Sequence, residues 1–426
     1  MNSEWPDVML KEVTSILGDG LHGTPVYDDS GDYFFINGSN LDDGRIVISN
    51  STKRVAFSEY EKYKKNLNDR TILVSINGTL GNIGLYQGEK VVLGKSACYF
   101  NVLESVDKNF IRYVLASSLF QGYISNLATG STIKNVSLRL MREFSFKLPP
   151  LGIQSKISLI LKSLDDRITL LRETNATLEA IAQALFKSWF VDFDPVRAKA
   201  KGLEPEGMEA ATAALFPASF EESRLGLIPK GWKCSTIGQS LILTMGQSPP
   251  GDTYNENGEG IPFYQGRTDF GFRFPTQRIF CSAPTRLAEA GDTLVSVRAP
   301  VGDVNVALQP CALGRGVASV RHPNGHQSFV LYSLRALKKH FELYDGEGTV
   351  FGSINKKDFQ TLPIFLSSDS LLEEFEGIVA PLDAGIESNE KRLRALMQLR
   401  DTLLPRLISG QLRLPEAHAQ IEEACV

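Results

Sequence analysis

Apolar residues recur every three or four positions through two stretches of the chain, residues 152–192 and 370–410. In the first stretch these positions are Ile157, Leu161, Leu164, Ile168, Leu171, Leu178, Ala182, Leu185 and Trp189, with Asn175 at the one missing place. Steps that alternate between four and three residues form the heptad seam of a coiled coil. The pattern therefore predicts a long helix over residues 149–195.

The second stretch repeats this seam, with an offset of 218 positions from Leu161 to Val379. Its seam positions are Phe375, Val379, Leu382, Ile386, Asn389, Leu393, Leu396, Arg400, Leu403 and Leu407. A second long helix is predicted over residues 367–414. Pro381 and Pro405 should kink or end it locally, because proline removes a helical hydrogen bond and its ring clashes with the preceding turn.

A helix of about 40 residues is about 60 Å long at ~1.5 Å per residue, which exceeds the width of a small domain. An ordinary amphipathic helix lying on its own domain is the alternative, but that length favours a partner along the whole helix. Since each helix follows its own globular half, we expect the two helices to pair antiparallel. Full overlap places Asn175 opposite Asn389, and a buried Asn pair fixes register at some cost in stability.

The remaining sequence predicts an α+β fold with two strand-rich globular halves, residues 1–148 and 226–366. Short β-branched and aromatic runs separated by Gly, Asn and Asp turns predict strands at Tyr33–Ile36, Ile46–Ser49, Ile72–Ile76, Val91–Leu93 and Thr293–Val297. One helix is expected in each half, at Lys108–Leu119 and Gln327–His340. A connecting segment, residues 196–225, should hold a short helix near Met208–Leu215. Residues 415–426 should form a polar, frayed tail.

The two halves also repeat each other in sequence. Residues 71–84 read TILVSINGTLGNIG, and residues 292–305 read DTLVSVRAPVGDVN. Ser75 then matches Ser296, and Gly81 matches Gly302. The further matches are Leu93-Gly94-Lys95 with Leu313-Gly314-Arg315, and Phe35-Ile36-Asn37-Gly38 with Phe263-Tyr264-Gln265-Gly266. Because these matches keep the same order at nearly the same offset, they indicate an internal duplication.

Similarity is lost in the loops, as between Ser39–Phe57 and Arg267–Phe280. A retained scaffold with divergent surface loops is what two domains that bind two different targets require.

Composition and charge narrow the class of protein. The chain has 426 residues, 42% hydrophobic and 22% charged, which is ordinary for a globular protein of more than one domain. It has no run of about 18 apolar residues, so no membrane association is expected. Its five cysteines form no metal-ligand cluster and no even disulfide framework, so a cytoplasmic location is expected.

Signatures of catalysis are absent from the sequence. There is no phosphate-binding GxxxxGK[ST] loop and no G-x-G-x-x-G motif. The histidines are not spaced as metal ligands, and His322 and His326 are expected to be loop residues. We therefore expect no catalytic residue, no metal site and no cofactor in this chain, which is predicted not to be an enzyme by itself.

DNA binding has more support, although the net charge of −4 argues mildly against it. Residues 226–365 hold 14 Lys and Arg against 11 Asp and Glu, while residues 1–148 hold 16 of each. Basic and amide side chains can pair with phosphates or read base edges. The candidates are Lys53, Arg54, Lys64, Lys65, Asn77, Lys134, Asn135, Arg267, Arg273, Arg278, Arg298, Arg315, Lys356 and Lys357. The alternative for any one of them is solvated surface.

Several motifs resemble the specificity subunits of type I restriction–modification systems over essentially the whole chain. These are Leu148-Pro149-Pro150 with Gln154, the turn Gly130-Ser131-Thr132, the run ALFKSWFVDFDP at 184–195, Gly207-Met208 with AALFP at 213–217, IPKGW at 228–232, and LRDTLLP at 399–405 with Ser409-Gly410. The run at 184–195 is long and distinctive. The recognition loops depart from a generic member, so the resemblance assigns no base-contacting residue.

The resemblance implies two target recognition domains, each binding one half of a split, asymmetric site in double-stranded DNA. The paired helices would form the spacer between the half-sites. Two modification (methyltransferase) subunits are the implied partners, joined by restriction (motor and nuclease) subunits for cleavage. A coiled-coil adaptor that binds proteins at both ends, and a methyltransferase or nuclease acting alone, are the competing hypotheses.

Overall fold

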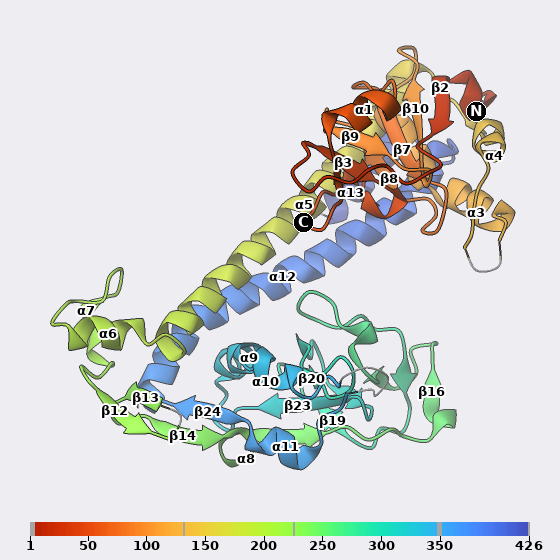
Figure 1. Cartoon of the computed structure of the whole chain (residues 1–426). Helices are drawn as coiled ribbons and strands as arrows, with labels where there is room; N and C mark the ends of the chain where they lie inside the picture. Colours follow the sequence, from red (N-terminus) through yellow and green to blue (C-terminus); the bar gives the residue numbers. More distant parts are fainter. Residues whose placement is uncertain (1–4, 131–132, 225, 347–351, 425–426) are drawn as a thin grey trace. The chain divides into compact units, whose positions relative to one another are not determined.

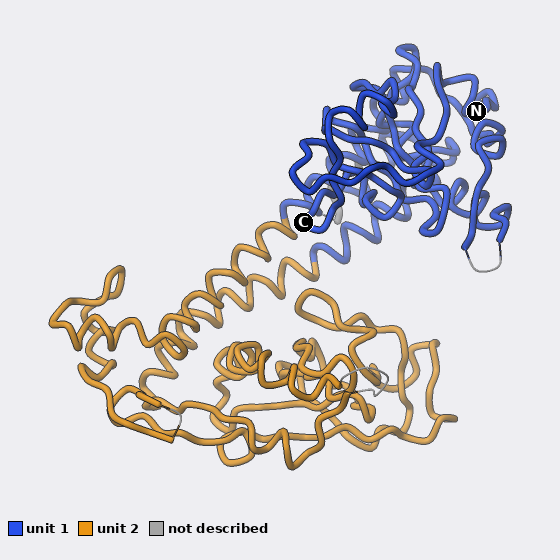
Figure 2. Tube along the Cα trace, in the orientation of Figure 1, with its two compact units in different colours: residues 1–170, 392–426 blue, residues 171–391 orange. Residues whose placement is uncertain are grey.

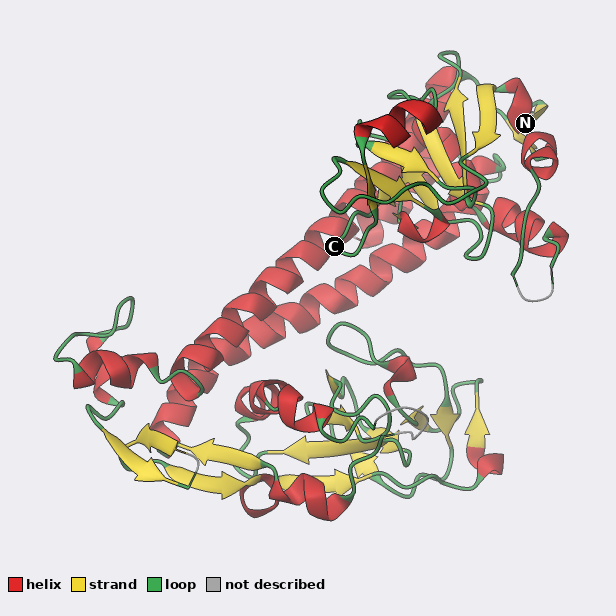
Figure 3. Cartoon of the chain, viewed as in Figure 1, coloured by secondary structure: helices red, strands yellow, loops and turns green. Residues whose placement is uncertain are grey.

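The computed structural model describes residues 5–130, 133–224, 226–346 and 352–424. Contacts divide the chain into two compact units, residues 1–170 with 392–426 (unit 1) and residues 171–391 (unit 2), as Figure 2 shows. Each unit holds one strand-rich half and part of each long helix. Helices and strands are mixed in both units (Figure 3), which confirms the α+β class. Ser131 and Thr132 of the predicted turn lie outside the described residues.

The central sheet of unit 1 is antiparallel, with strand order β2-β10-β7-β8. Its strands are β2 (Thr14–Asp19), β10 (Ala97–Val102), β7 (Thr71–Ser75) and β8 (Ile83–Leu85). A second sheet has order β6-β3-β9, formed by β6 (Arg54–Val55), β3 (Tyr33–Ile36) and β9 (Val91–Leu93), with β3 parallel to β9. Two strand pairs and four helices complete this half: β1 (Asp7–Met9) with β11 (Ser145–Lys147), β4 (Leu41–Asp42) with β5 (Arg45–Ile46), α1 (Phe57–Tyr63), α2 (Lys108–Ala116), α3 (Ser118–Leu127) and α4 (Leu138–Glu143).

Unit 2 has the same plan. Its antiparallel sheet has order β15-β23-β20-β21, formed by β15 (Ile242–Met245), β23 (Val317–Arg321), β20 (Thr293–Ser296) and β21 (Val304–Val306). A five-stranded sheet has order β16-β18-β17-β22-β19, formed by β16 (Tyr254–Asn255), β18 (Phe280–Cys281), β17 (Ile261–Tyr264), β22 (Cys311–Leu313) and β19 (Leu287–Ala288). The other elements are β12 (Phe220–Ser223) with β13 (Gly226–Pro229), β14 (Lys233–Thr236) with β24 (Pro363–Leu366), α6 (Asp194–Ala200), α7 (Ala210–Ala214), α8 (Ile237–Ser240), α9 (Gln327–Ala336), α10 (Lys338–Glu342) and α11 (Lys356–Thr361).

The internal duplication predicted from the sequence is present in the sheets. The four-stranded sheets of the two units have equivalent strand orders, and β17 runs parallel to β22 as β3 runs parallel to β9. Strands β7 and β20, which carry the best sequence match, are buried at every residue. A strand that is covered on both faces needs a continuous apolar run, and this explains why the match is so well kept there.

Outside the two long helices, the secondary-structure predictions differ from the structure mainly in the following places. The strand predicted at Ile46–Ser49 is wrong beyond Ile46, where β5 ends. The helix predicted at Lys108–Leu119 is α2 followed by α3, and the one at Gln327–His340 is α9 followed by α10. The tail predicted to be frayed contains helix α13 (Leu414–Ala424), because Leu412 and Ala417 are buried within unit 1 despite their polar surroundings in sequence.

Two helices of 40 residues each, α5 (Leu151–Phe190) and α12 (Asp369–Ile408), follow the two strand-rich halves (Figure 1). Helix α5 begins directly after Pro149-Pro150, where proline is tolerated because the first helical N–H groups need no intrahelical partner. Gln154 is buried there, accepting the Asp107 N–H at 2.9 Å and donating to Pro149 O at 2.7 Å. The helix start is thereby tied to the strand-rich half of unit 1.

Helix α12 continues through Pro381 and Pro405, so the predicted end at a proline is not observed. Phe375, Val379 and Ile386 on either side of Pro381 are fully buried. Because tertiary packing contributes most of the stability of helices in proteins, this buried face holds the helix across the missing hydrogen bond.

Within unit 2, the predicted contact between Asn175 and Asn389 is confirmed. Asn389 Nδ2 donates to Asn175 Oδ1 at 2.9 Å, and Asn175 Nδ2 donates to Glu390 Oε1 at 2.9 Å. Farther along, Phe186 of α5 lies 5.9 Å from Phe375 of α12, ring centre to ring centre. Since the residue numbers rise on α5 as they fall on α12, the two segments run antiparallel.

The distinctive run at 184–195 has a structural role in unit 2. Phe186, Trp189, Phe190 and Phe193 are buried in one hydrophobic cluster with residues of the strand-rich half. Phe190, for example, lies 5.2 Å from Phe329 of α9. Aromatic side chains bury a large apolar area, so this run attaches the end of α5 to the second half.

Candidate nucleic-acid interface

The loop between β7 and β8, residues 76–82, closes on itself through Ser75. The N–H of Ser75 donates to Asn82 O at 2.8 Å, and the N–H of Gly81 donates to Ser75 O at 2.9 Å. The Ser75 hydroxyl donates to Thr79 O inside the loop. Gly81 has a φ of +82°, a conformation that favours glycine. These residues are the ones that the internal repeat retains.

The equivalent loop of unit 2, residues 297–303 between β20 and β21, has the same hydrogen bonds. The N–H of Ser296 donates to Asp303 O at 2.9 Å, and the N–H of Gly302 donates to Ser296 O at 2.9 Å. The Ser296 hydroxyl donates to Pro300 O at 2.8 Å, and Gly302 has a φ of +91°. The repeated motif is therefore the sequence of one loop conformation, used twice.

A second chain segment holds the first loop in place and brings three predicted residues together. Asn77 forms an antiparallel bridge with Asn135, and the N–H of Gly78 donates to Lys134 O at 3.0 Å. Asn77 Nδ2 also donates to Asn135 Oδ1 at 3.3 Å. Lys134 is exposed, whereas Asn77 and Asn135 are half-buried. The structure thus collects Asn77, Lys134 and Asn135 into one polar surface.

The same bridge exists in unit 2. Arg298 pairs with Ser353, and the N–H of Ala299 donates to Gly352 O at 2.9 Å. The Arg298 side chain is exposed. Arg298 and Asn77 therefore occupy the same backbone position in the two copies of the loop.

An open pocket of about 590 Å³ lies beside the first loop. It is lined by Leu21, His22, Gly23, Thr24, Phe35, Asn37, Asn77, Lys95, Ser96 and Ile133. Ser96 Oγ donates to Asn37 Oδ1 at 3.0 Å and accepts the Gly38 N–H at 2.9 Å. Lys95 and Asn37 were missed in the sequence-based list of candidates. The internal repeat could have identified Lys95, because Lys95 aligns with the candidate Arg315.

Arg315 lies in the matching place in unit 2. Its side chain is exposed, and its Nε donates to Ser248 Oγ at 3.2 Å. The next residue, Gly316, accepts the N–H of Val297 at 2.9 Å, so Arg315 is adjacent to the loop that carries Arg298. Each loop thus has an exposed cation at this matching place, Lys95 in unit 1 and Arg315 in unit 2.

Comparisons with known proteins find similarity to one family. The sequence model of the type I restriction modification DNA specificity domain matches residues 2–180. A putative type I restriction enzyme MjaX specificity subunit of Methanocaldococcus jannaschii is 27% identical, over 96% of this chain and 94% of that protein. The HindI specificity subunit of Haemophilus influenzae is 28% identical, over 70% of this chain and 78% of that protein. Both relatives are named as type I specificity subunits, and this chain is similar to them over most of its length.

A solved type I S subunit from M. genitalium has a similar fold. Its TM-score is 0.57 at 19% sequence identity, with 95% of this chain and 96% of that one covered. This likeness concerns the fold alone.

In the part of the chain that the structure describes, no group of three or more His, Cys, Asp or Glu side chains is placed to hold a metal ion. Among the described helices, none is long and apolar enough to cross a bilayer.

The remaining candidates of the first half lie on other elements of the chain. Lys53 precedes β6, and Arg54 within β6 lies 4.9 Å from the centre of the Phe34 ring. Lys64 and Lys65 follow α1. The Lys64 ammonium donates to Glu61 at 2.8 Å, and this hydrogen bond raises its pKa. Lys53, Arg54 and Lys64 are exposed and remain candidates for phosphate contacts.

In the second half, most candidates are exposed, and two of them form ion pairs. Arg267 forms an ion pair with Asp303 of the loop at 2.8 Å, and Arg278 pairs with Asp269 at 3.0 Å. Lys356 and Lys357 are exposed at the start of α11. Through its ion pair with Asp303, Arg267 is attached to the loop that carries Arg298.

Arg273 is a wrong candidate. Its side chain is only 2% exposed, and its Nη1 lies 2.7 Å from Asp383 Oδ1. Nη2 forms an ion pair with Glu179 and donates to the Tyr332 hydroxyl at 2.9 Å. A guanidinium enclosed by two carboxylates and a phenol inside unit 2 cannot reach DNA. It joins the strand-rich half to α5 and α12 instead.

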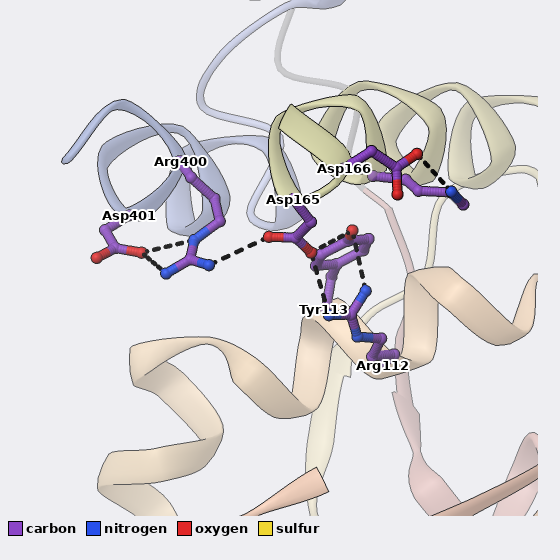
Figure 4. Close-up of polar contacts among 7 residues, drawn as sticks. Arg112, Tyr113, Asp165, Asp166, Arg400 and Asp401 are labelled. Carbon is purple, nitrogen blue, oxygen red and sulfur yellow. Dashed lines mark hydrogen bonds and ion pairs between the residues drawn. The ribbon is translucent and has the colours of Figure 1, made fainter. Parts of the chain in front are cut away.

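Asp165 of α5 joins the other strand-rich half to the helices, as Figure 4 shows. It accepts a hydrogen bond from the Tyr113 hydroxyl at 2.8 Å, and Arg112, the neighbour of Tyr113 on α2, lies 3.1 Å from it. On the opposite side, Arg400 of α12 lies 3.1 Å from Asp165 (Figure 4). Asp165 therefore holds three elements of unit 1 together.

Unit 2 repeats this arrangement with Asp383, which accepts from the Tyr332 hydroxyl at 2.9 Å. Burial raises the pKa of Tyr113 and of Tyr332, so both phenols keep the proton that they donate. We call Tyr113 with Asp165, and Tyr332 with Asp383, the two Tyr–Asp pairs. Nothing in the sequence-based reasoning had identified them.

Proposed function

We propose that this chain is the specificity subunit of a type I restriction–modification complex and directs it to one bipartite, asymmetric target in double-stranded DNA, as its similarity to named specificity subunits suggests. Each strand-rich half would read one half-site, the first half residues 1–148 and the second half residues 226–366. The paired helices would set the gap between the half-sites and dock the methyltransferase subunits.

The observation that carries this proposal is the duplicated loop with different side chains. Asn77 and Arg298 occupy the same position of the same hydrogen-bonded loop, on the same strand order. A common scaffold with different polar groups at one place suits two readers of different sequences. Arg and Asn are also the side chains that make specific contacts with base edges.

Charge is consistent with this role only in part. Phosphate contacts supply most non-specific affinity, and the net charge of the whole chain is −4. The exposed cations near the loops, Lys95, Lys134, Arg298 and Arg315, are few. We therefore propose that the methyltransferase subunits add phosphate contacts, so the isolated chain binds DNA weakly and with strong dependence on salt.

The internal duplication also supports the proposed stoichiometry. Two copies of one fold present two equivalent surfaces, which suits two copies of one partner. We therefore propose two modification subunits as partners of this chain. Restriction subunits would join them in the full complex.

Methylome sequencing of a host that expresses this chain with its modification subunit tests the proposal. We expect one bipartite motif with a fixed internal gap. Exchanging residues 1–148 for those of another specificity subunit should change one half of that motif and leave the other half and the gap unchanged. A continuous motif, or a change in both halves, would contradict the assignment of one half-site to each half.

The purified chain alone provides the control. Incubated with S-adenosylmethionine and mixed DNA, it should transfer no methyl groups, and transfer would favour a methyltransferase acting alone. Loss of every methylation mark when the chain is deleted, with the modification subunit still present, would show that recognition depends on this chain.

A further inference from the structure

Asn77 and Arg298 are held in place by their backbones rather than by their side chains. The N–H of Ile76 donates to Ser96 O at 2.9 Å, and that of Val297 donates to Gly316 O at 2.9 Å. On the other side of each residue, the bridges to Asn135 and Ser353 complete the frame. A side chain at this position projects from a backbone fixed on both sides, and fixed placement is what base readout requires.

The surroundings of the position are equivalent as well. The N–H of Gly94 donates to Ile36 O at 2.8 Å, and the N–H of Gly314 donates to Tyr264 O at 2.8 Å. These bonds place Lys95 and Arg315, the residues that follow the two glycines, in matching positions. Both are exposed, so each loop offers one polar side chain beside one cation.

The two polar side chains differ in what they can bind. The guanidinium of Arg298 has a fork of N–H donors, which matches the two acceptors O6 and N7 of guanine. The amide of Asn77 has donors and an acceptor, which match N7 and N6–H of adenine. One amide hydrogen of Asn77 is used in the 3.3 Å bond to Asn135, which orients the amide and leaves its second hydrogen for a base.

We propose that this shared position determines one base of each half-site, with Arg298 reading a guanine and Asn77 reading an adenine in the major groove. Lys95 and Arg315 contact neighbouring phosphates. The inference rests on the proposed function, because it assumes that each half reads one half-site.

The test uses the full chain assembled with its modification subunit, carrying Arg298→Asn in one variant and Asn77→Arg in another. Binding is measured by selection from duplex DNA randomised across both half-sites, and methylation by methylome sequencing. Arg298→Asn should change the preference at one base pair of one half-site, away from guanine. Asn77→Arg should change one base pair of the other half-site, away from adenine. A bidentate contact discriminates by about 5- to 150-fold, so the change is measurable.

Arg298→Lys separates base reading from charge. Lysine keeps the positive charge but has no planar fork, so guanine preference should fall while the salt dependence of binding stays near that of the wild type. Arg224→Asn is the matched control, because Arg224 is exposed and lies outside residues 226–366. It should leave every base preference unchanged.

The outcomes separate this inference from the proposed function. An unchanged motif in both variants, with a bipartite wild-type motif, would overturn the inference and leave the proposed function standing. A uniform loss of affinity over all sequences would also overturn it, since it would make these residues phosphate contacts. If the wild-type motif is not bipartite, the proposed function itself fails. Should Arg298→Asn not assemble, Arg298→Lys decides the question for the second half and Asn77→Arg for the first.

Discussion

Asp165 and Asp383 lie at equivalent places on the two long helices, and each accepts a hydrogen bond from a tyrosine of the strand-rich half in its own unit. Their arginine partners are unrelated in sequence position: Arg112 and Arg400 in unit 1, Arg273 in unit 2. The tyrosine is thus the shared part of the joint, and the compensating positive charge comes from a different place in each unit. A buried carboxylate needs such a charge, because desolvation otherwise disfavours its ionised form.

Replacing Arg273 should destabilise unit 2 strongly. Arg273→Ala leaves the buried Glu179 and the half-buried Asp383 without this cation, and breaking a buried pair in this way costs about 3–5 kcal/mol. Arg335 still pairs with Glu179, which puts the expected loss near the lower end. Urea unfolding followed by the fluorescence of Trp189 and Trp232, both buried in unit 2, measures it.

Arg278→Ala is the matched control for that change. Arg278 also pairs with a carboxylate, Asp269, but its own side chain is 55% exposed, so the loss should be below about 1 kcal/mol. Equal effects of the two substitutions would contradict the assignment of Arg273 as a buried joint.

His322 should make unit 2 less stable as the pH falls below about 6.5. Burial, and then the neighbouring His326, lower the pKa of the His322 imidazole. The unfolded chain therefore takes up this proton at a higher pH than the folded chain does. Stability from this group is present above the unfolded pKa and is lost as the pH falls through the folded pKa.

Comparing wild type with His322→Asn isolates this contribution. The Asn324 N–H donates to His322 Nδ1 at 3.1 Å, and the Asn side-chain oxygen can accept that bond without titrating. The free energy of unfolding measured at pH 7 and at pH 5.5 should fall more in the wild type than in the variant. Parallel decreases would exclude His322 as the cause.

At the scale of the elements, α5 and α12 carry polar groups within an otherwise apolar seam. Asn175 is only 1% exposed and bonds to both Asn389 and Glu390. A polar pair in this place contributes less stability than a leucine pair and excludes alternative registers, which is the best-attested role of buried Asn in coiled coils. That role remains a proposal for this chain.

Substituting both asparagines tests the register proposal. The double variant Asn175→Leu with Asn389→Leu should unfold at the same or a higher urea concentration, because both amides are removed together and the half-buried Glu390 can be hydrated instead. Asn389→Leu alone should cost about 1–3 kcal/mol, because it leaves the buried Asn175 oxygen without its donor. If the pair sets the register, the complex with the double variant should methylate sites with more than one gap length. A single gap with full stability would show that the asparagines do not set it.

Elements could be predicted where the sequence pattern that defines them lies within one segment of the chain. The seam from Ile157 to Trp189 repeats often enough to define α5, and its arithmetic alone placed Asn175 opposite Asn389. The burial of Arg273 was not predictable, since its partners Glu179 and Asp383 are 94 and 110 positions away in sequence. Helix α13 was missed because its anchors, Leu412 and Ala417, are isolated among polar residues.

Part of the candidate interface was also predictable from the sequence, and part was not. The repeated motif located both loops, since Ser75 and Gly81 recur as Ser296 and Gly302 to close one turn conformation. The pocket beside the first loop was not found, because Asn37 and Lys95 meet there only after the parallel pairing of β3 with β9.

At the scale of the whole molecule, we expect the two long helices to set the distance between the two DNA half-sites. Inserting seven residues after Leu170 and seven after Lys391 adds one heptad to each helix at the same level of the antiparallel pairing. The Asn175–Asn389 contact and both Tyr–Asp pairs stay within their own units. Each helix lengthens by about 10 Å, which corresponds to about three base pairs.

Methylome sequencing should then show the same two half-sites separated by a wider gap. Insertion into one helix alone provides the control: it breaks the pairing, and should reduce methylation rather than widen the gap. An unchanged gap with the paired insertion would show that the partner subunits, not the helices, set the distance.

The division of the chain into units has a consequence for its biosynthesis. Unit 1 is completed only by residues 392–426, which leave the ribosome after the whole of unit 2. At about 5–20 residues per second, the strand-rich half emerges about 10–45 s before them. During that time the buried face of α5 formed by Ile157, Leu161, Leu164 and Ile168 has no α12 to cover it. The nascent chain is therefore most exposed to aggregation and chaperone binding while its second half is being translated, and any truncation before residue 392 leaves this apolar stripe open in the finished product.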